Sequence, residues 1–373
     1  MTAEEQGPIE PAGDPPTPPA IRRGKGMRLS TQGPPAEERA PEPPAVPPAA
    51  PKLRGQGLRL STHAAPPDGA AATPPPSMDQ ALELALAAPR RVRLAHGEVS
   101  YRQSGDGPPL LLIHGWAASS RYWFGALAQL ADIRTCYAID LPGFGGSQSL
   151  PVPAAIARQA ALVIEFADAL GLEQFDLNGH SFGASVAAYV AAHWPARVRR
   201  LVLTSIGVRR SALERALLGL VLRPVDLALQ IWQPWLNMAR PLSGLLQPMA
   251  ASLMSMPPLP RLMSSWYLEQ APADERWLRE GILDLTRMDF AAHLACVASI
   301  GDSSLIAALA AIRAPTLLVS GRADRVVPQD DVAAAAEMVA GSRLLILDEC
   351  GHVPLVEQPA AYHQALREFL LEV

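Results

Sequence analysis

The chain has 373 residues, of which 49% are hydrophobic and 18% charged, with 38 prolines, 3 cysteines and a formal net charge of −4. The balance of 32 basic and 36 acidic residues excludes a bulk positive field of the kind that binds nucleic acid. Three widely spaced cysteines exclude a disulfide scaffold and supply no metal-ligand cluster, so we expect a reducing, cytoplasmic location and no metal or cofactor.

Residues 1–78 differ in composition from the rest of the chain. Nineteen of the 38 prolines precede residue 77, and the first aromatic residue is Tyr101. Proline removes backbone donors, and too few large apolar groups are present to offset the entropy lost on ordering. We therefore predict a disordered, partly polyproline-II tail. We expect no secretory signal in it and no transmembrane helix, because an uninterrupted apolar run of about 20 residues is lacking.

A nine-residue motif, R-G-x-G-[ML]-R-L-S-T, occurs twice in this tail. The first copy begins at Arg23 and ends at Thr31, and the second begins at Arg54 and ends at Thr62. Two such short units cannot stack into a solenoid. The conserved register favours a pair of docking motifs for a protein partner, which would gain avidity from two tethered weak contacts. Neutral duplication is the alternative.

Beyond the tail, residues 79–90 predict a short connecting helix, and residues 91–373 a single domain. Two strands flank a turn at His96 and Gly97, and LLLIHGW is the continuous apolar run of a buried parallel strand. Helices are predicted at RYWFGALAQLAD and from Pro153 to Leu170, and strands at TCYAID, RVRRLVLTSIG, PTLLVSG and SRLLILD. This alternation predicts an α/β fold with a mostly parallel, doubly wound sheet.

The segment FDLNGHSFGASVAAYV predicts a strand, a sharp turn and a helix, with Ser181 at the turn. Gly179 and Gly183 flank this serine in the G-x-S-x-G pattern of a nucleophile elbow. In that motif the serine takes a strained backbone conformation that presents its hydroxyl at the edge of the sheet, and the glycines let neighbouring backbones approach. The apolar strand before it and the helix after it supply the required context.

Two residues that could activate Ser181 follow later strands. Asp324 lies in SGRADRVVP and His352 in CGHVPLVEQP, each just beyond a predicted strand, where the strand ends converge on one edge. A serine hydroxyl needs a histidine to take its proton and a carboxylate to orient that histidine. The backbone N–H groups of Phe182 and Trp116 are the candidate oxyanion donors, with Ala117 as the alternative to Trp116.

Five motifs, LLLIHGWAASSRYW, IDLPGFGGS, NGHSFGAS, GRADRVVP and GHVPLVEQP, together resemble the α/β-hydrolase superfamily over residues 91–206 and 299–373. The resemblance implies a triad of Ser181, His352 and Asp324, oxyanion donors at Trp116 and Phe182, and a loop glycine at Gly115. Serine at the elbow argues against the haloalkane dehalogenase and epoxide hydrolase branches, which use aspartate there.

Four neighbouring residues favour a structural interpretation. His114 is expected to orient the oxyanion loop, and Asp140 to form a turn bordering the pocket. The side chain of His180 is expected to point away from the nucleophile and to pack, and Cys350 to be a buried, inert thiol.

Residues 208–298, hereafter the insert, stand where this superfamily places a helical cap. LALQIWQPWLNMA and PLSGLLQPMAASLMSMPPLP lack any charge, and prolines interrupt both. Leucine and methionine adapt to irregular apolar ligands. Three interpretations stay open: simple packing onto the core, a pocket for a lipophilic acyl chain or ester, and a membrane-surface patch supported by nearby arginines.

The sequence therefore predicts a serine hydrolase acting on an ester, thioester or related acyl bond of a hydrophobic small molecule. The same residues would serve a C–C bond hydrolase, a cofactor-free peroxidase or an acyltransferase. A non-catalytic scaffold or ligand receptor working through its tail is the alternative from another class.

Overall fold

The computed structural model describes residues 88–149, 155–208 and 304–372, with separate positions between 248 and 289. The predicted tail with its two motifs, residues 79–87 of the connecting helix and most of the insert lie outside the described residues. The described strands are β1 (Arg90–Leu94), β2 (Gly97–Ser104), β3 (Pro109–Ile113), β4 (Thr135–Ile139), β5 (Phe175–His180), β6 (Val198–Thr204), β7 (Thr316–Gly321) and β8 (Arg343–Leu347). The described helices are η1 (Ser120–Trp123), α2 (Phe124–Gln129), α3 (Ile156–Ala169), α4 (Phe182–His193), α6 (Leu259–Ser264), α9 (Ser304–Ala311), α10 (Gln329–Met338), α11 (Pro354–Glu357) and α12 (Pro359–Leu371).

The strands of the described chain form one eight-stranded sheet in the order β1-β2-β4-β3-β5-β6-β7-β8. β2 pairs antiparallel with β1 and β4, whereas every pairing from β4 through β3 and β5 to β8 is parallel. This arrangement confirms the predicted mostly parallel sheet.

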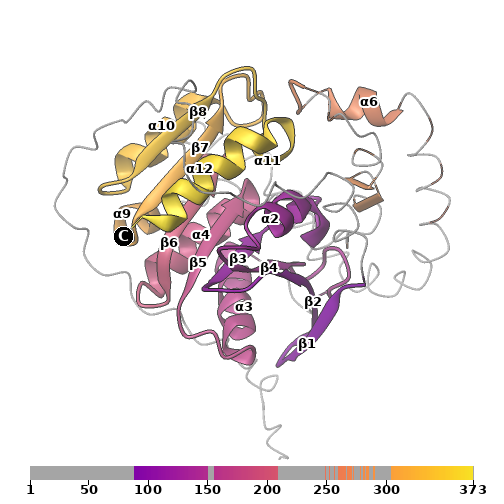
Figure 1. Ribbon diagram of the computed structural model, residues 1–373, viewed down its shortest axis with the longest axis vertical. Coiled ribbons are helices and arrows are strands. Elements are labelled where there is room, and N and C mark those ends of the chain that lie inside the picture. The colour runs from indigo at the N-terminus through magenta and orange to yellow at the C-terminus, as the bar shows by residue number, and fades with distance from the viewer. Residues whose placement is uncertain are drawn as a thin grey trace, which may run out of the picture. The chain divides into compact units, whose positions relative to one another are not determined.

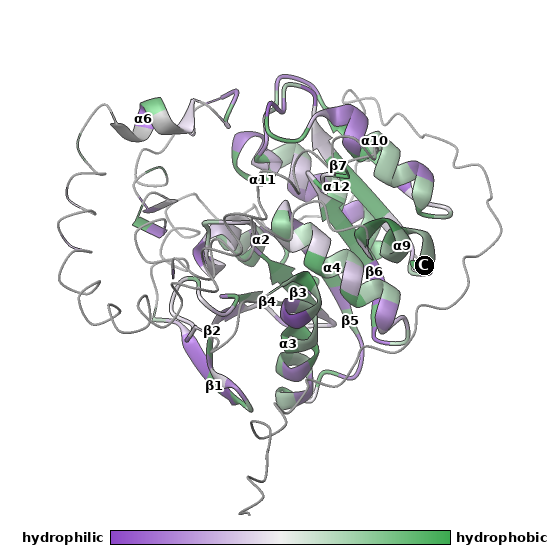
Figure 2. Cartoon of the chain, turned by 180° about the vertical axis from the view of Figure 1, so that it is seen from behind, coloured by the Kyte–Doolittle hydropathy of each residue, from purple (hydrophilic) through white to green (hydrophobic). Residues whose placement is uncertain are grey.

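The central strand β3 shows why its run of apolar residues is continuous. Leu111 and Ile113 point into the core that α3, α4, α9 and α10 cover, whereas Leu110 and Leu112 point into the core under α2, α11 and α12. Figures 1 and 2 show these two helix layers from opposite sides of the sheet. Because helices cover both faces of the sheet, the side chains that point to one face and those that point to the other must all be apolar. The doubly wound prediction is confirmed, and no helix in the described part of the chain is long and apolar enough to cross a membrane.

The predicted connecting helix is wrong at its C-terminal end. Arg90 is the first residue of β1 and pairs with Tyr101. Its guanidinium also donates to Gln103 Oε1 at 2.7 Å, and Arg91 forms an ion pair with Glu98 on the same neighbouring strand. These cross-strand contacts favour strand directly after Pro89, the residue at which the helical pattern of the sequence ends.

The parallel strands bring the predicted site residues to one edge of the sheet. Ser181 follows β5, Asp324 follows β7 and His352 follows β8. The N–H of Ser181 donates to the carbonyl of Thr204 at 2.8 Å, so β6 sets the point at which the chain turns away from the sheet. The carboxyl ends of neighbouring parallel strands form the usual ligand-binding edge of such folds.

Candidate active site

Ser181 sits in a strained turn between β5 and α4. Its backbone has φ of +53° and ψ of −117°, a region that residues with a side chain rarely adopt. A Cβ on Gly179 would collide with the backbone of Gly183, and a Cβ on Gly183 would collide with the carbonyls of Ile113 and His114. Glycine at these two predicted positions is therefore required by the close approach of α4 to β5 and β3.

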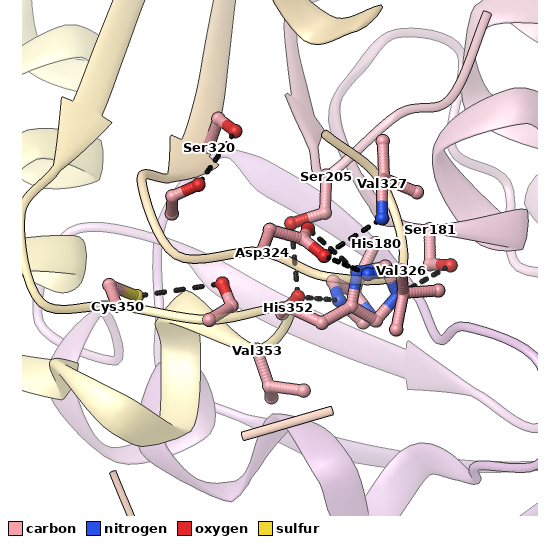
Figure 3. A network of polar contacts seen from close by, with 12 residues as sticks. His180, Ser181, Ser205, Ser320, Asp324, Val326, Val327, Cys350, His352 and Val353 are labelled. Carbon is pink, nitrogen blue, oxygen red and sulfur yellow. Dashed lines mark hydrogen bonds and ion pairs between the residues drawn. The ribbon is translucent and has the colours of Figure 1, made fainter. Parts of the chain in front are cut away.

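The imidazole of His352 links Ser181 to Asp324 (Figure 3). Its Nε2 lies 3.0 Å from Ser181 Oγ, and its Nδ1 lies 2.8 Å from Asp324 Oδ2. Both distances are hydrogen-bond lengths. The structure thus brings the three predicted catalytic side chains into one chain of contacts, with the histidine between the hydroxyl and the carboxylate.

The carboxylate of Asp324 is held by its own loop. Its Oδ1 accepts hydrogen bonds from the N–H groups of Val326 and Val327, each at 2.8 Å, which leaves Oδ2 for the imidazole (Figure 3). The side chain is fully buried, whereas that of His352 is 10% exposed. In such surroundings the attraction between a carboxylate and an imidazolium is stronger than in water.

The backbone of His352 is fixed on both sides. Its carbonyl accepts from Ser205 Oγ at 3.0 Å and lies 2.9 Å from His180 Nε2, while its N–H donates to the carbonyl of Tyr267 at 3.0 Å. Burial lowers the pKa of His180 to about 3, so this ring is neutral and its Nε2 carries the proton donated to His352. His180 is thus a structural residue, and the group that it contacts is the backbone of the candidate base.

The two predicted oxyanion residues belong to segments that meet at Ser181. Phe182 is the first residue of α4, where an N–H group has no partner within the helix. Gly115 adjoins Ser181 so closely that a Cβ on the glycine would lie 3.3 Å from the serine Cβ, and Trp116 follows directly. Ala117 has a positive φ of 59°, which marks this loop as a second tight turn beside Ser181.

His114 and Asp140 hold the loop that carries Trp116. The N–H of Leu141 donates to His114 Nε2 at 3.0 Å, so Nδ1 carries the proton and donates to the carbonyl of Gly115 at 2.7 Å. Burial lowers the pKa of His114, which keeps this ring neutral. Asp140 accepts from the N–H groups of Ser120 and Gly146, at 2.5 and 2.9 Å. These contacts agree with the structural roles expected from the sequence.

The remaining candidates are buried groups of little reactivity. Cys136 and Cys350 are free, buried thiols, and burial raises the pKa of both. A buried thiol with a raised pKa is a poor nucleophile. Within the described ranges, no group of three His, Cys, Asp or Glu side chains is arranged to hold a metal ion.

Sequence reasoning missed three residues that hold the backbone around His352, namely Ser205, Glu357 and Tyr267. Ser205 directly follows β6, and its place after a parallel strand was an available signal. Glu357 lies in the quoted motif GHVPLVEQP, but nothing local singles it out. Tyr267, in the insert, contributes only its backbone carbonyl, a group that every residue type supplies.

Two curated proteins resemble this chain over most of their length. A pimeloyl-[acyl-carrier protein] methyl ester esterase of Aeromonas salmonicida is 28% identical over 279 residues, which cover 73% of this chain and 99% of the esterase. A 2-hydroxymuconate semialdehyde hydrolase of Pseudomonas sp. (strain CF600) is 28% identical over 296 residues, which cover 76% of this chain and 94% of that hydrolase. The first is by name an ester hydrolase.

The fold recurs in solved structures. A bacterial membrane phospholipase A, described as a virulence factor, superposes with a TM-score of 0.60 at 27% identity, covering 78% of this chain and 87% of its own. Residues 108–359 match the family described as alpha/beta hydrolase fold. With its parallel sheet, its strained serine turn and esterases among its relatives, this chain belongs to the alpha/beta hydrolase family and is a hydrolase.

Proposed function

We propose that the protein is a serine hydrolase that cleaves an ester, thioester or related acyl bond through an acyl-enzyme on Ser181. The observation that carries this proposal is the bridging position of the His352 ring, 3.0 Å from Ser181 Oγ and 2.8 Å from Asp324 Oδ2. A nucleophile, a base and an orienting carboxylate in hydrogen-bond contact are the arrangement that acyl transfer requires.

In the first half of the reaction Ser181 Oγ attacks the carbonyl carbon while His352 Nε2 takes the hydroxyl proton. Asp324 holds the proton on Nδ1 and stabilises the imidazolium that forms. The negative charge that develops on the substrate oxygen rests on the backbone N–H groups of Phe182 and Trp116. Collapse of the tetrahedral intermediate then breaks the acyl bond, and His352 passes its proton to the leaving group.

In the second half a water molecule takes the place of the leaving group. His352 Nε2 removes a proton from this water, whose oxygen attacks the acyl carbon of the Ser181 ester. The same N–H groups hold the second oxyanion, and the proton returns to Ser181 Oγ as the acid product leaves. The buried carboxylate of Asp324 serves both halves without itself being protonated.

A lipophilic substrate is the second part of the proposal. The insert carries two long uncharged stretches rich in leucine and methionine, which suit an irregular apolar ligand. The Aeromonas relative is named as a methyl ester esterase and the solved relative as a phospholipase A, and both names denote enzymes that cleave esters. We infer that the insert covers Ser181 as a helical cap and that the acyl chain lies beneath it.

Cleavage of a C–C bond beside a carbonyl is the second candidate, and one observation favours it. The relative from Pseudomonas, matched over 94% of its length, is named as a 2-hydroxymuconate semialdehyde hydrolase. Parallel assays with a p-nitrophenyl ester and with a semialdehyde of that class separate the two reactions. A kcat/KM at least about 100-fold higher for the ester supports the acyl proposal, and the reverse order overturns it.

The test of the nucleophile is Ser181→Ala. We expect this variant to lose turnover of short p-nitrophenyl esters and labelling by a fluorophosphonate probe, because both need the serine oxygen. Ser342→Ala removes a hydroxyl that bonds only the carbonyl of Ala336 and is the matched control. Labelling that survives Ser181→Ala would refute the assignment. No labelling of the folded wild type would favour the scaffold alternative.

We also propose that the two tail motifs dock a protein partner. Their support is the nine-position match at an offset of 31 residues. Deleting residues 1–78 is expected to change kcat by less than about twofold and to abolish co-purification of the partner. A large loss of kcat on deletion would show that the tail serves the site.

We assign the protein to the cytoplasm. The support is chemical, because Cys136 and Cys350 are both unpaired and buried, as in proteins of reducing compartments. Fractionation of the source cells tests this assignment, and recovery from an extracytoplasmic fraction would overturn it.

A further inference from the structure

Glu357, at the end of α11, is a buried carboxylate outside the triad with an unusual set of partners. Its Oε2 accepts from the N–H groups of Gly351, Glu269 and Gln270 at 2.9, 2.7 and 3.1 Å. Its Oε1 accepts from the N–H of Val353 at 2.9 Å. All four donors are peptide groups, and together they use the acceptor capacity of one carboxylate.

Two of these donors flank His352. Gly351 precedes the histidine and Val353 follows it, so one carboxylate grips the backbone on both sides of the candidate base. Hydrogen bonds from peptide N–H groups to a carboxylate are charge-assisted and stronger than neutral ones. The direction of the Cα–Cβ bond of His352, and hence the reach of its ring, depends on this grip.

The other two donors belong to the insert. We call residues 264, 265 and 267–270 the strap. Its N–H groups at Glu269 and Gln270 meet Glu357, and its carbonyl at Tyr267 accepts from the N–H of His352 at 3.0 Å. The side chain of Leu268 is buried in the core beneath α11 and α12. The strap is thus joined to the histidine loop by backbone contacts that centre on one side chain.

Gly351 makes this junction sterically tight. A Cβ on Gly351 would lie 2.8 Å from the nitrogen of Glu269 and 3.0 Å from both oxygens of Glu357. The φ of Gly351 is not positive, so alanine could adopt the same backbone conformation. The Cβ of that alanine would nevertheless collide with the neighbouring atoms. The glycine therefore allows strap, carboxylate and histidine loop to meet.

We propose that Glu357 is a positioning residue that holds the backbone of His352 and couples its placement to the strap of the insert. The inference rests on the proposed serine hydrolase function. Glu357 touches neither substrate nor the reacting atoms. Its effect is on the orientation of the imidazole toward Ser181 Oγ, to which the rate of proton transfer is sensitive.

The test compares Glu357→Gln and Gly351→Ala with Glu368→Gln, which alters an exposed side chain of α12 bonded only to Gln364. Glu357→Gln keeps the side-chain volume but turns an NH₂ group toward peptide donors. Gly351→Ala forces the same junction apart while leaving the carboxylate in place. Active sites are counted by burst titration with a p-nitrophenyl ester, so that a loss of folded protein does not count as a loss of rate.

We expect both junction variants to lower kcat per active site about 10- to 100-fold, with KM within about threefold of the wild type. The rate of fluorophosphonate labelling should fall in parallel, and Glu368→Gln should match the wild type. A kcat per active site within twofold of the wild type in both junction variants would overturn the proposal. An unlabelled wild type would instead defeat the proposed function.

Hydrogen exchange of the wild-type protein tests the proposal without any variant that could fail to fold. If Glu357 accepts the four N–H groups, peptides spanning Gly351 to Val353 and Glu269 to Gln270 exchange slowly and are protected together. Rapid exchange of either peptide in the native protein would overturn the proposal without any substitution.

Discussion

Among the described residues of the insert, two groups that contact the catalytic core differ in chemistry. The strap meets the histidine loop through peptide groups gathered on Glu357. The second set, which we call the charged cluster, joins the insert to the loop after β3 through side chains. Its members are Ser119, Arg121, Glu280 and Asp284.

The charged cluster is built around a buried ion pair. Arg121 pairs with Asp284 and, at 2.7 Å, with Glu280, and Ser119 Oγ donates to Asp284 Oδ2 at 2.6 Å. The Asp284 side chain is 4% exposed, and burial raises its pKa despite the nearby arginine. At the strap the Glu357 carboxylate accepts only from peptide N–H groups, whereas in the charged cluster the Asp284 carboxylate pairs with the guanidinium of Arg121. The histidine loop and the oxyanion loop are therefore held by carboxylates with different kinds of partner.

Removing the carboxylate that binds the strap should have the largest effect on the free energy of unfolding. Glu357→Ala leaves four peptide N–H groups without their acceptor, and each buried, unpaired donor is costly. We expect the free energy of unfolding to fall by about 3–5 kcal/mol, measured by urea denaturation. Glu368→Ala, on the exposed side of α12, should stay within about 0.5 kcal/mol of the wild type.

Breaking the charged cluster should cost less, and its cost should depend on Asp284. Arg121→Ala removes the guanidinium that pairs with the buried carboxylate, so we expect a loss of about 2–4 kcal/mol. Adding Asp284→Asn removes the buried charge and should restore part of this loss. The double-mutant cycle should give a coupling energy of about 1–3 kcal/mol.

A reference cycle on Arg367 and Asp132 calibrates this result. That pair is partly exposed, with side-chain exposures of 34% and 57%, and its coupling should stay below about 1 kcal/mol. Equal coupling energies in the two cycles would show that burial gives the charged cluster no special weight.

A buried histidine that belongs to neither attachment gives the stability a dependence on pH. Burial lowers the pKa of His363 to about 4 from 6.5, so the unfolded chain binds a proton that the folded protein does not. The stability from this group is complete above pH 6.5 and is lost as the pH falls toward 4, by up to about 1.4 kcal/mol per pH unit. Asp284 acts in the opposite sense, because its raised pKa favours proton binding by the folded protein.

The measurement is urea unfolding of the wild type and of His363→Asn across this range. The variant should flatten the loss of stability with falling pH. An unchanged slope in His363→Asn would place the acid sensitivity elsewhere.

The same contrast explains which parts of the molecule could be predicted from sequence. The sheet was predictable because runs such as β3 carry apolar residues for both faces, and the elbow because Gly179 and Gly183 are demanded by local approach. That Arg90 belongs to β1 could not be predicted locally, because its partners lie on β2. Contacts such as Glu357 to the N–H of Glu269 join residues 88 apart and use the backbone, which every residue type supplies.

The smallest expected effect separates the backbone of the strap from its side chains. Glu269 contributes both an N–H to Glu357 and an ion pair to Arg325 at 2.6 Å, with side-chain exposures of 61% for the arginine and 35% for the glutamate. Glu269→Gln removes the ion pair and keeps the peptide donor. We expect a change of less than about 1 kcal/mol in the free energy of unfolding, since exposed pairs contribute little. A loss as large as that of Glu357→Ala would mean that the strap, like the charged cluster, is held by its side-chain charges.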